Sequence, residues 1–145
     1  MPNLPDLGST PLGRSLDPVD AAGLTFLSLA FDSVLNNVLD DIVASRGLRI
    51  DRLDVFGLLE QAMADPSAFD LVDVTNPAFQ RATGTVVDNP EGYLFWDDVH
   101  PTARAHALLG QAAITAVPEP TAAVLASLGL LMIGGAIRRS RRRFD

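Results

Sequence analysis

The chain has 145 residues, enough for about one domain, and no cysteine, which excludes disulfides and thiol chemistry. Its net charge is -7, and every basic residue is Arg: residues 1–116 carry 6 Arg against 16 acidic residues, whereas residues 117–145 carry 5 Arg against 2. An acidic body with a basic end argues against nucleic acid as a partner of the body.

The first residues predict a loop. Asn3-Leu4-Pro5-Asp6-Leu7-Gly8-Ser9-Thr10-Pro11 contains two prolines and a glycine within a short span. The opening has neither a charged region nor an apolar run, so we expect no signal peptide here. Asp6-Leu7-Gly8-Ser9 is superficially like a Gly-Asp-Ser nucleophile turn, but its order differs and no strand precedes it. We therefore do not expect Ser9 to be a nucleophile.

A long helix is predicted from Asp20, as N-cap, to about Ser45, with Gly47 as the stop. Apolar residues recur at spacings of three and four, which indicates one apolar helix face. That face comprises Leu24, Leu27, Phe31, Val34, Val38 and Ile42.

Shorter elements are predicted beyond this helix. Residues 48–55 alternate apolar and charged side chains, which favours an edge strand on which the helix packs. Gly57–Ala64 predicts a short helix that ends before Asp65-Pro66. Residues 65–94 are mostly loop, with a brief extended piece at residues 71–74.

Phe95-Trp96-Asp97-Asp98-Val99-His100-Pro101-Thr102 carries the main candidate for chemistry. An ester-cleaving serine enzyme needs an imidazole to take the proton of the serine, and a carboxylate to hold that imidazole in the right tautomer. Asp97 and His100, three residues apart, supply both groups from one turn of chain. We predict that His100 is the general base and that Asp97 orients it.

Thr102 is a suitable N-cap for a helix over Ala103–Ala116. His106 lies on that predicted helix, and we expect a structural role for it. We expect Asp98, beside the motif, to be a solvated or capping acid.

The motif resembles the last block of the SGNH/GDSL hydrolase family, which reads Asp-x-x-His-Pro-Thr and usually follows aromatic residues. Residues 3–11 resemble the segment that leaves the fourth sheet strand of these enzymes, although an ordinary Pro-rich tail stays open as an alternative. The resemblance implies an α/β fold. Residues 1–116 would be the C-terminal portion of a flavodoxin-like SGNH hydrolase domain with an incomplete parallel sheet. The motif loop would lie near the carboxyl end of the strand at 48–55. The implied activity is that of a lipase or esterase on an ester substrate, with no cofactor and no metal.

Other family blocks are not recognisable. Members take their nucleophile from a Gly-Asp-Ser block and complete the oxyanion hole with a Gly and an Asn, and Asn3 does not sit in the family's Gly-x-Asn-Asp pattern. We therefore expect no nucleophile in this chain and no ester hydrolysis by the chain alone. Two interpretations remain. One is the C-terminal portion of a longer exported hydrolase. The other is a non-catalytic cell-surface protein with a decayed hydrolase segment.

Residues 117–145 carry a second, separate signal. A Pro-Glu-Pro sequence stops the preceding helix, residues 121–137 form an uncharged run near the lower limit for crossing a bilayer, and an Arg cluster follows. This order resembles the PEP-CTERM sorting signal of Gram-negative bacteria, which implies a transmembrane helix over 121–137 and an exosortase as partner. The signal residues are Pro118, Glu119, Pro120, Arg138, Arg139, Arg141, Arg142 and Arg143.

The Arg cluster should stay in the cytoplasm, which places residues 1–116 across the membrane. The resemblance implies transient residence in the inner membrane, then the cell surface or extracellular matrix. A plain tail anchor stays open as an alternative. A nucleic-acid-binding arm is the poorest choice, because an apolar helix adjoins the arginines.

Overall fold

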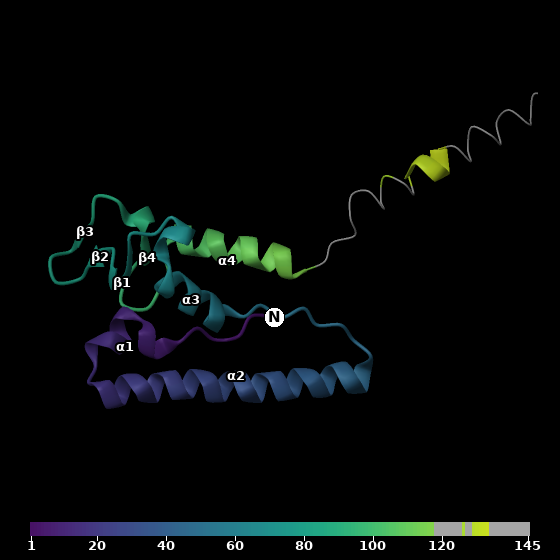
Figure 1. Ribbon diagram of the computed structural model, residues 1–145, viewed down its shortest axis with the longest axis horizontal. Helices are drawn as coiled ribbons and strands as arrows, with labels where there is room; N and C mark the ends of the chain where they lie inside the picture. Colours follow the sequence, from purple (N-terminus) through teal and green to yellow (C-terminus); the bar gives the residue numbers. More distant parts are fainter. Residues whose placement is uncertain (118–125, 127–128, 134–145) are drawn as a thin grey trace, which may run out of the picture.

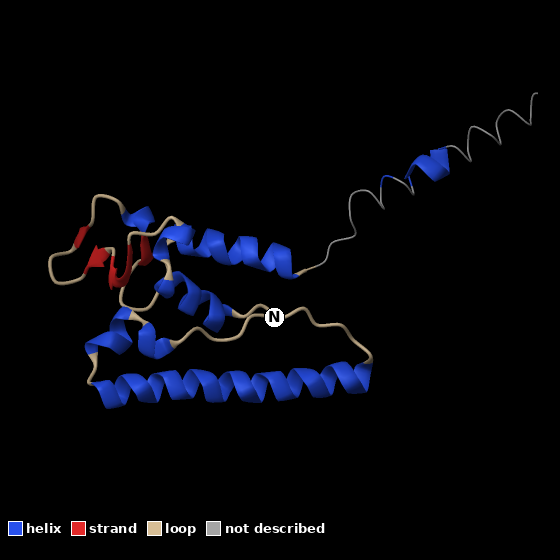
Figure 2. Ribbon diagram, in the orientation of Figure 1, coloured by secondary structure: helices blue, strands red, loops and turns tan. Residues whose placement is uncertain are grey.

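The computed structural model describes residues 1–117, 126 and 129–133, and its fold is α/β with a small parallel sheet (Figures 1 and 2). The helices are α1 (Pro11–Ser15), α2 (Pro18–Arg46), α3 (Val55–Ala64) and α4 (Ala103–Ala116). Short 3-10 turns are η1 (Leu7–Ser9), η2 (Pro66–Phe69) and η3 (Pro90–Gly92). The strands are β1 (Asp73–Pro77), β2 (Phe79–Gln80), β3 (Thr85–Val86) and β4 (Tyr93–Phe95).

Two strand pairs are present in the described residues. β1 and β4 run parallel, with Asp73 opposite Tyr93 and Pro77 opposite Phe95. β2 and β3 form an antiparallel hairpin. The brief extended piece predicted at residues 71–74 thus corresponds to β1, displaced toward the C-terminus.

The predicted strand at residues 48–55 is wrong. Among the described residues, this segment pairs only through one isolated parallel bridge, between Pro2 and Leu53, and α3 already begins at Val55. The pairing stops because Asn3 turns its side chain onto the start of α3: its Oδ1 accepts from the N–H of Val55 at 2.6 Å and from that of Phe56 at 3.3 Å. The motif loop accordingly follows the carboxyl end of β4 instead.

The long helix is confirmed, but its cap differs. Asp17 is the N-cap, because its Oδ1 accepts from the N–H groups of Val19 and Asp20 at 2.9 and 3.0 Å. Asp20 lies in the first turn, where its charge favours the helix dipole. Gly47 ends the helix with φ 61°, a conformation that glycine adopts without a side-chain clash.

The apolar face that the periodicity predicted is present in α2 and is mostly exposed. Leu27, Phe31, Val34, Val38 and Ile42 are 37–62% exposed. The N-terminal segment instead binds the neighbouring face through polar contacts: the N–H of Leu4 donates to Asp32 Oδ1 at 2.8 Å, and that of Leu7 donates to Ser28 Oγ at 3.2 Å.

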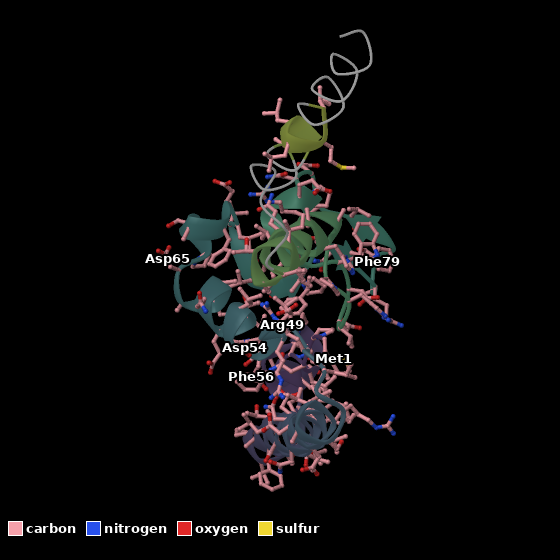
Figure 3. All side chains as sticks on the ribbon, turned by 90° about the vertical axis from the view of Figure 1, so that its right-hand side faces the viewer. Met1, Arg49, Asp54, Phe56, Asp65 and Phe79 are labelled. Carbon is pink, nitrogen blue, oxygen red and sulfur yellow. The ribbon has the colours of Figure 1, made fainter. Side chains whose placement is uncertain are left out.

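The core lies between α3, α4 and the parallel strands. Its buried members are Leu59, Ala62, Leu71, Val74, Leu94, Phe95 and Ala105. Figure 1 shows α2 along one side of the molecule, α3 and α4 on the other, and the N-terminal segment between them. Figure 3 shows Met1 and Asp54 in this middle region, consistent with the hydrogen bond from Asn3 Nδ2 to Asp54 Oδ1 at 3.0 Å.

One helix in the described residues, α2, is long and apolar enough to cross a membrane by length and composition, although it lies near the N-terminus. The predicted transmembrane helix at 121–137 falls mostly outside the described residues. Within it, Leu130, Leu131, Met132 and Ile133 are helical and exposed.

Candidate functional site

A short hairpin-like loop positions the candidate catalytic pair. β4 ends at Phe95, which bridges antiparallel to Pro101, and the N–H of Trp96 donates to the carbonyl of His100 at 2.7 Å. Thr102 then fixes the exit, because its hydroxyl donates to the Tyr93 carbonyl at 2.7 Å and accepts from the N–H of Ala105 at 3.1 Å. The predicted N-cap and the predicted helix, Ala103–Ala116, are both confirmed.

The structure brings Asp97 and His100 together. Nδ1 of His100 lies 3.0 Å from Oδ1 and 2.9 Å from Oδ2 of Asp97. Oδ1 also accepts from the N–H groups of Val99 and His100, at 2.9 and 2.7 Å. The imidazole is 75% exposed, whereas the carboxylate is 22% exposed. With Nδ1 engaged by the carboxylate, Nε2 is left for the proton of a nucleophile.

The electrostatics of the loop favour a charged Asp97. Partial burial raises the pKa of Asp97, but the backbone N–H groups of His100 and Val99 and the adjacent imidazole together outweigh burial. The pKa of this carboxyl is therefore held below its ordinary value. A carboxylate that stays ionised fixes the imidazole tautomer and stabilises the imidazolium that forms when His100 takes a proton.

Three residues that contact this loop, Phe79, Arg81 and Leu12, were not singled out from the sequence. The ring of Phe79 in β2 stacks on Trp96, with centroids 6.1 Å apart and planes 12° apart. Asp98 forms an ion pair with Arg81 at 3.2 Å, and its carbonyl accepts from the N–H of Leu12 at 2.8 Å. The sequence signal for Phe79 and Arg81 was weak, because the β2–β3 hairpin is too short to show an alternating pattern.

An apolar hollow of about 420 Å³ borders the loop. It is lined from α3, α4, β4 and the N-terminal segment, and Val99 and Pro101 contribute to its wall. Neither Trp96 nor His100 is among its lining residues.

The remaining sequence candidates have structural contacts. Ser9 donates its hydroxyl to Asp6 Oδ2 at 2.5 Å, and Asn3 caps α3. His106 lies on α4, with Nδ1 3.0 Å from the Thr102 carbonyl. Among the described residues, no group of three or more His, Cys, Asp or Glu side chains is placed to hold a metal ion.

The predicted sorting residues lie outside the described part of the chain. They are Pro118, Glu119, Pro120, Arg138, Arg139, Arg141, Arg142 and Arg143.

No protein-family model matches the chain. Two curated proteins match most of it. A GDSL esterase/lipase of Arabidopsis thaliana is 25% identical over 129 residues, which cover 80% of this chain and 36% of that protein. The phosphatidylcholine-sterol acyltransferase of Aeromonas hydrophila is 26% identical over 157 residues, which cover 78% of this chain and 46% of that protein. The chain thus spans less than half the length of these relatives.

A third relative, the anther-specific proline-rich protein APG of Arabidopsis thaliana, is 26% identical over 73 residues, which cover 43% of this chain. Together, the distant homologies suggest an ester-acting hydrolase family, at the level of the family alone.

Proposed function

We propose that residues 1–116 are the C-terminal portion of an SGNH/GDSL-type ester hydrolase, in which His100 is the general base and Asp97 orients it. The observation that carries the proposal is the contact of Nδ1 with both carboxylate oxygens, at 3.0 and 2.9 Å. The likeness to a GDSL esterase/lipase supports the same chemistry. The substrate class is a carboxylic ester.

In this mechanism the nucleophile comes from chain outside these 145 residues. The serine Oγ attacks the ester carbonyl carbon while its proton passes to Nε2 of His100, and the imidazolium then gives that proton to the departing alcohol oxygen. Water then attacks the acyl carbon while its proton passes to Nε2, and the imidazolium gives a proton to the serine Oγ as the acyl–oxygen bond breaks and the carboxylic acid leaves. Asp97 keeps Nδ1 protonated throughout, because its carboxylate accepts the Nδ1 hydrogen bond.

The test compares the chain alone with a longer protein restored from the DNA upstream of Met1. We expect no turnover of a p-nitrophenyl ester by the chain alone. In the restored protein, His100→Ala should abolish turnover and Asp97→Asn should lower kcat by roughly four orders of magnitude, as a wrong tautomer does in other triads. Asp98→Asn and His106→Ala are the matched controls and should change kcat little. Activity of the 145-residue chain that disappears with Ser9→Ala would overturn the proposal.

A non-catalytic surface protein is the second candidate, because no Gly-Asp-Ser nucleophile block is recognisable in the sequence. The Ser9 hydroxyl does not discriminate between the two candidates, because neither of them uses it: it is hydrogen-bonded to Asp6, which also accepts from Thr25 Oγ1 at 2.6 Å. Upstream DNA without an in-frame Gly-Asp-Ser block would support this candidate against the first.

We further propose that residues 117–145 are a PEP-CTERM sorting signal. A transmembrane helix over 121–137 would keep the Arg cluster in the cytoplasm, and an exosortase would cut near Pro118-Glu119-Pro120. Support comes from the order of the three parts in the sequence. Reporter fusions after residues 116 and 143 should lie on opposite sides of the membrane, and two reporters on one side would contradict the span.

A further inference from the structure

The backbone pairing at the site places Trp96 beside His100. Phe95 and Pro101 form an antiparallel bridge, so Trp96 and His100 are the next pair along it. The hydrogen bond from the Trp96 N–H to the His100 carbonyl, at 2.7 Å, confirms this pairing. Residues directly opposite each other in an antiparallel pair project their side chains from the same face. The indole and the imidazole therefore emerge side by side.

This face is distinct from the one that borders the apolar hollow. Phe95 and Pro101 both line the hollow, whereas Trp96 and His100 are not among its lining residues. The indole and the imidazole therefore lie outside the wall of the hollow.

The indole is held in place while part of it stays open. Trp96 is 40% exposed, and one of its neighbours is the nearly parallel ring of Phe79. The N–H of Phe79 donates to the Trp96 carbonyl at 2.7 Å, and the ion pair between Arg81 and Asp98 joins the same hairpin to the loop. Figure 3 shows Phe79 at the edge of the molecule. We call Phe79 and Trp96 the aromatic shelf.

We propose that the aromatic shelf binds an aromatic ring of the ester next to His100, so that aryl-bearing esters are the preferred substrates of this site. This inference rests on the proposed function. Exposed aromatic faces attract a further aromatic ring in offset or edge-to-face geometry, beyond the gain from buried area. An alicyclic ring of similar size lacks this additional aromatic attraction. The ordinary strength of the contact corresponds to a preference of roughly twofold to tenfold.

The experiment uses the single tryptophan of the sequence as its reporter. The full chain, held in mild detergent, is titrated with benzyl acetate and with cyclohexylmethyl acetate, two esters of primary alcohols that differ in the ring. We expect both to change Trp96 emission saturably, and benzyl acetate to bind roughly twofold to tenfold more tightly. Phe79→Ala should remove the preference. The matched control is Phe26→Ala, at a 69% exposed phenylalanine of α2, which should keep it.

A second readout tests the placement alone. His100→Gln removes the imidazole that is paired with Trp96 across the loop, so this variant should change the Trp96 emission of the chain without any ester. His106→Gln, on α4, is the matched control and should leave that emission unchanged. Equal emission in the parent and in His100→Gln would contradict the placement.

Equal affinities for the two esters, or a preference that survives Phe79→Ala, would overturn the proposal that the aromatic shelf binds the ring of the ester. The proposed function fails separately. If a restored protein hydrolyses neither ester while benzyl acetate still binds preferentially, the shelf stands as a binding site and the hydrolase assignment falls. If it hydrolyses both with equal kcat/KM, the hydrolase assignment stands and the shelf falls.

Discussion

The carboxylate of Asp97 accepts hydrogen bonds from the loop backbone and also contacts the imidazole of His100. Oδ1 accepts from two backbone N–H groups and approaches Nδ1 of His100, so the geometry of the loop and the orientation of the ring depend on one side chain. An amide at this position still offers one oxygen to the backbone, but it presents either that oxygen or an N–H₂ group to the imidazole. Asp97→Asn therefore changes the tautomer more than it changes the loop.

The lowered pKa of Asp97 also predicts a dependence of stability on acid. Above the ordinary value of 3.8, the carboxyl is ionised in the folded and the unfolded chain, and its stabilising contribution is fully present. As the pH falls below that value, the unfolded chain takes up the proton first, so this contribution is lost toward the lower pKa of the folded state.

We expect Asp97→Asn to flatten the acid limb of the free energy of unfolding. The measurement is urea denaturation of parent and variant at a series of pH values from neutral to below 3.8. Part of the slope should persist because of Asp73: burial raises the pKa of that carboxyl, but hydrogen bonds from Asn76 and Thr75 outweigh burial and lower it. Identical slopes in the two proteins would show that Asp97 contributes nothing to acid sensitivity.

The local geometry of the candidate site was predictable, because it depends on residues close in sequence. A spacing of three sets Asp97 against His100, and Thr102 directly precedes the helix that it caps. The ring of Phe79 was not predictable, because its contact with Trp96 depends on how a two-residue strand is placed. Turn geometry and tertiary contacts decide such placements, and neither produces a periodic pattern of residues in the sequence.

Among the elements, α2 shows what periodicity can and cannot determine. Its length and its end at Gly47 were predicted, since both depend on local backbone preferences. The face that holds the N-terminal segment was not predicted, because Ser28 and Asp32 are polar and bind that segment through its backbone N–H groups. A hydrophobic pattern identifies apolar side chains, and polar anchors on the adjacent face are invisible to it.

A pair of glycines tests this packing of the N-terminal segment on α2. A Cβ at Gly8 would overlap the Ala21 carbonyl oxygen and the Thr25 side chain, so Gly8→Ala should destabilise the protein by roughly 1–3 kcal/mol. Gly23 lies inside α2, and an added methyl group there would meet open space beyond the helix backbone, so Gly23→Ala should stabilise by about 0.5–1 kcal/mol. Thermal unfolding of both variants measures the difference, and equal effects would contradict the contact.

At the scale of the molecule, the described residues expose much apolar surface. The stripe formed by Leu27, Phe31, Val34, Val38 and Ile42 covers one face of α2. A second hollow, of about 510 Å³, adjoins it between α2 and the N-terminal segment. Contiguous apolar patches of this kind promote association in water.

We therefore expect residues 1–117, expressed alone, to self-associate as their concentration rises. Changing Val34 and Val38 together to Gln should reduce the apparent mass in sedimentation at a given concentration, because both side chains belong to the stripe. Val19→Gln is the control, since Val19 is 80% exposed at the first turn of α2 and lies outside the stripe. A reduction as large in the control would assign the association to general hydrophobicity instead of to this face.

The cap that Asn3 places on α3 bears on the order in which the chain folds. The amide oxygen of Asn3 accepts hydrogen bonds from the N–H groups of Val55 and Phe56, which lie 52 and 53 positions further along the chain. The whole of α2 lies between these partners. Such a contact has to overcome the entropy of closing a long loop, whereas α2 needs only its own residues and its two caps. During synthesis from the ribosome, α2 can therefore form early. The start of α3 has a local cap in Asp54, which accepts from the Gly57 N–H, and it gains the contact with Asn3 only after α2 has been made.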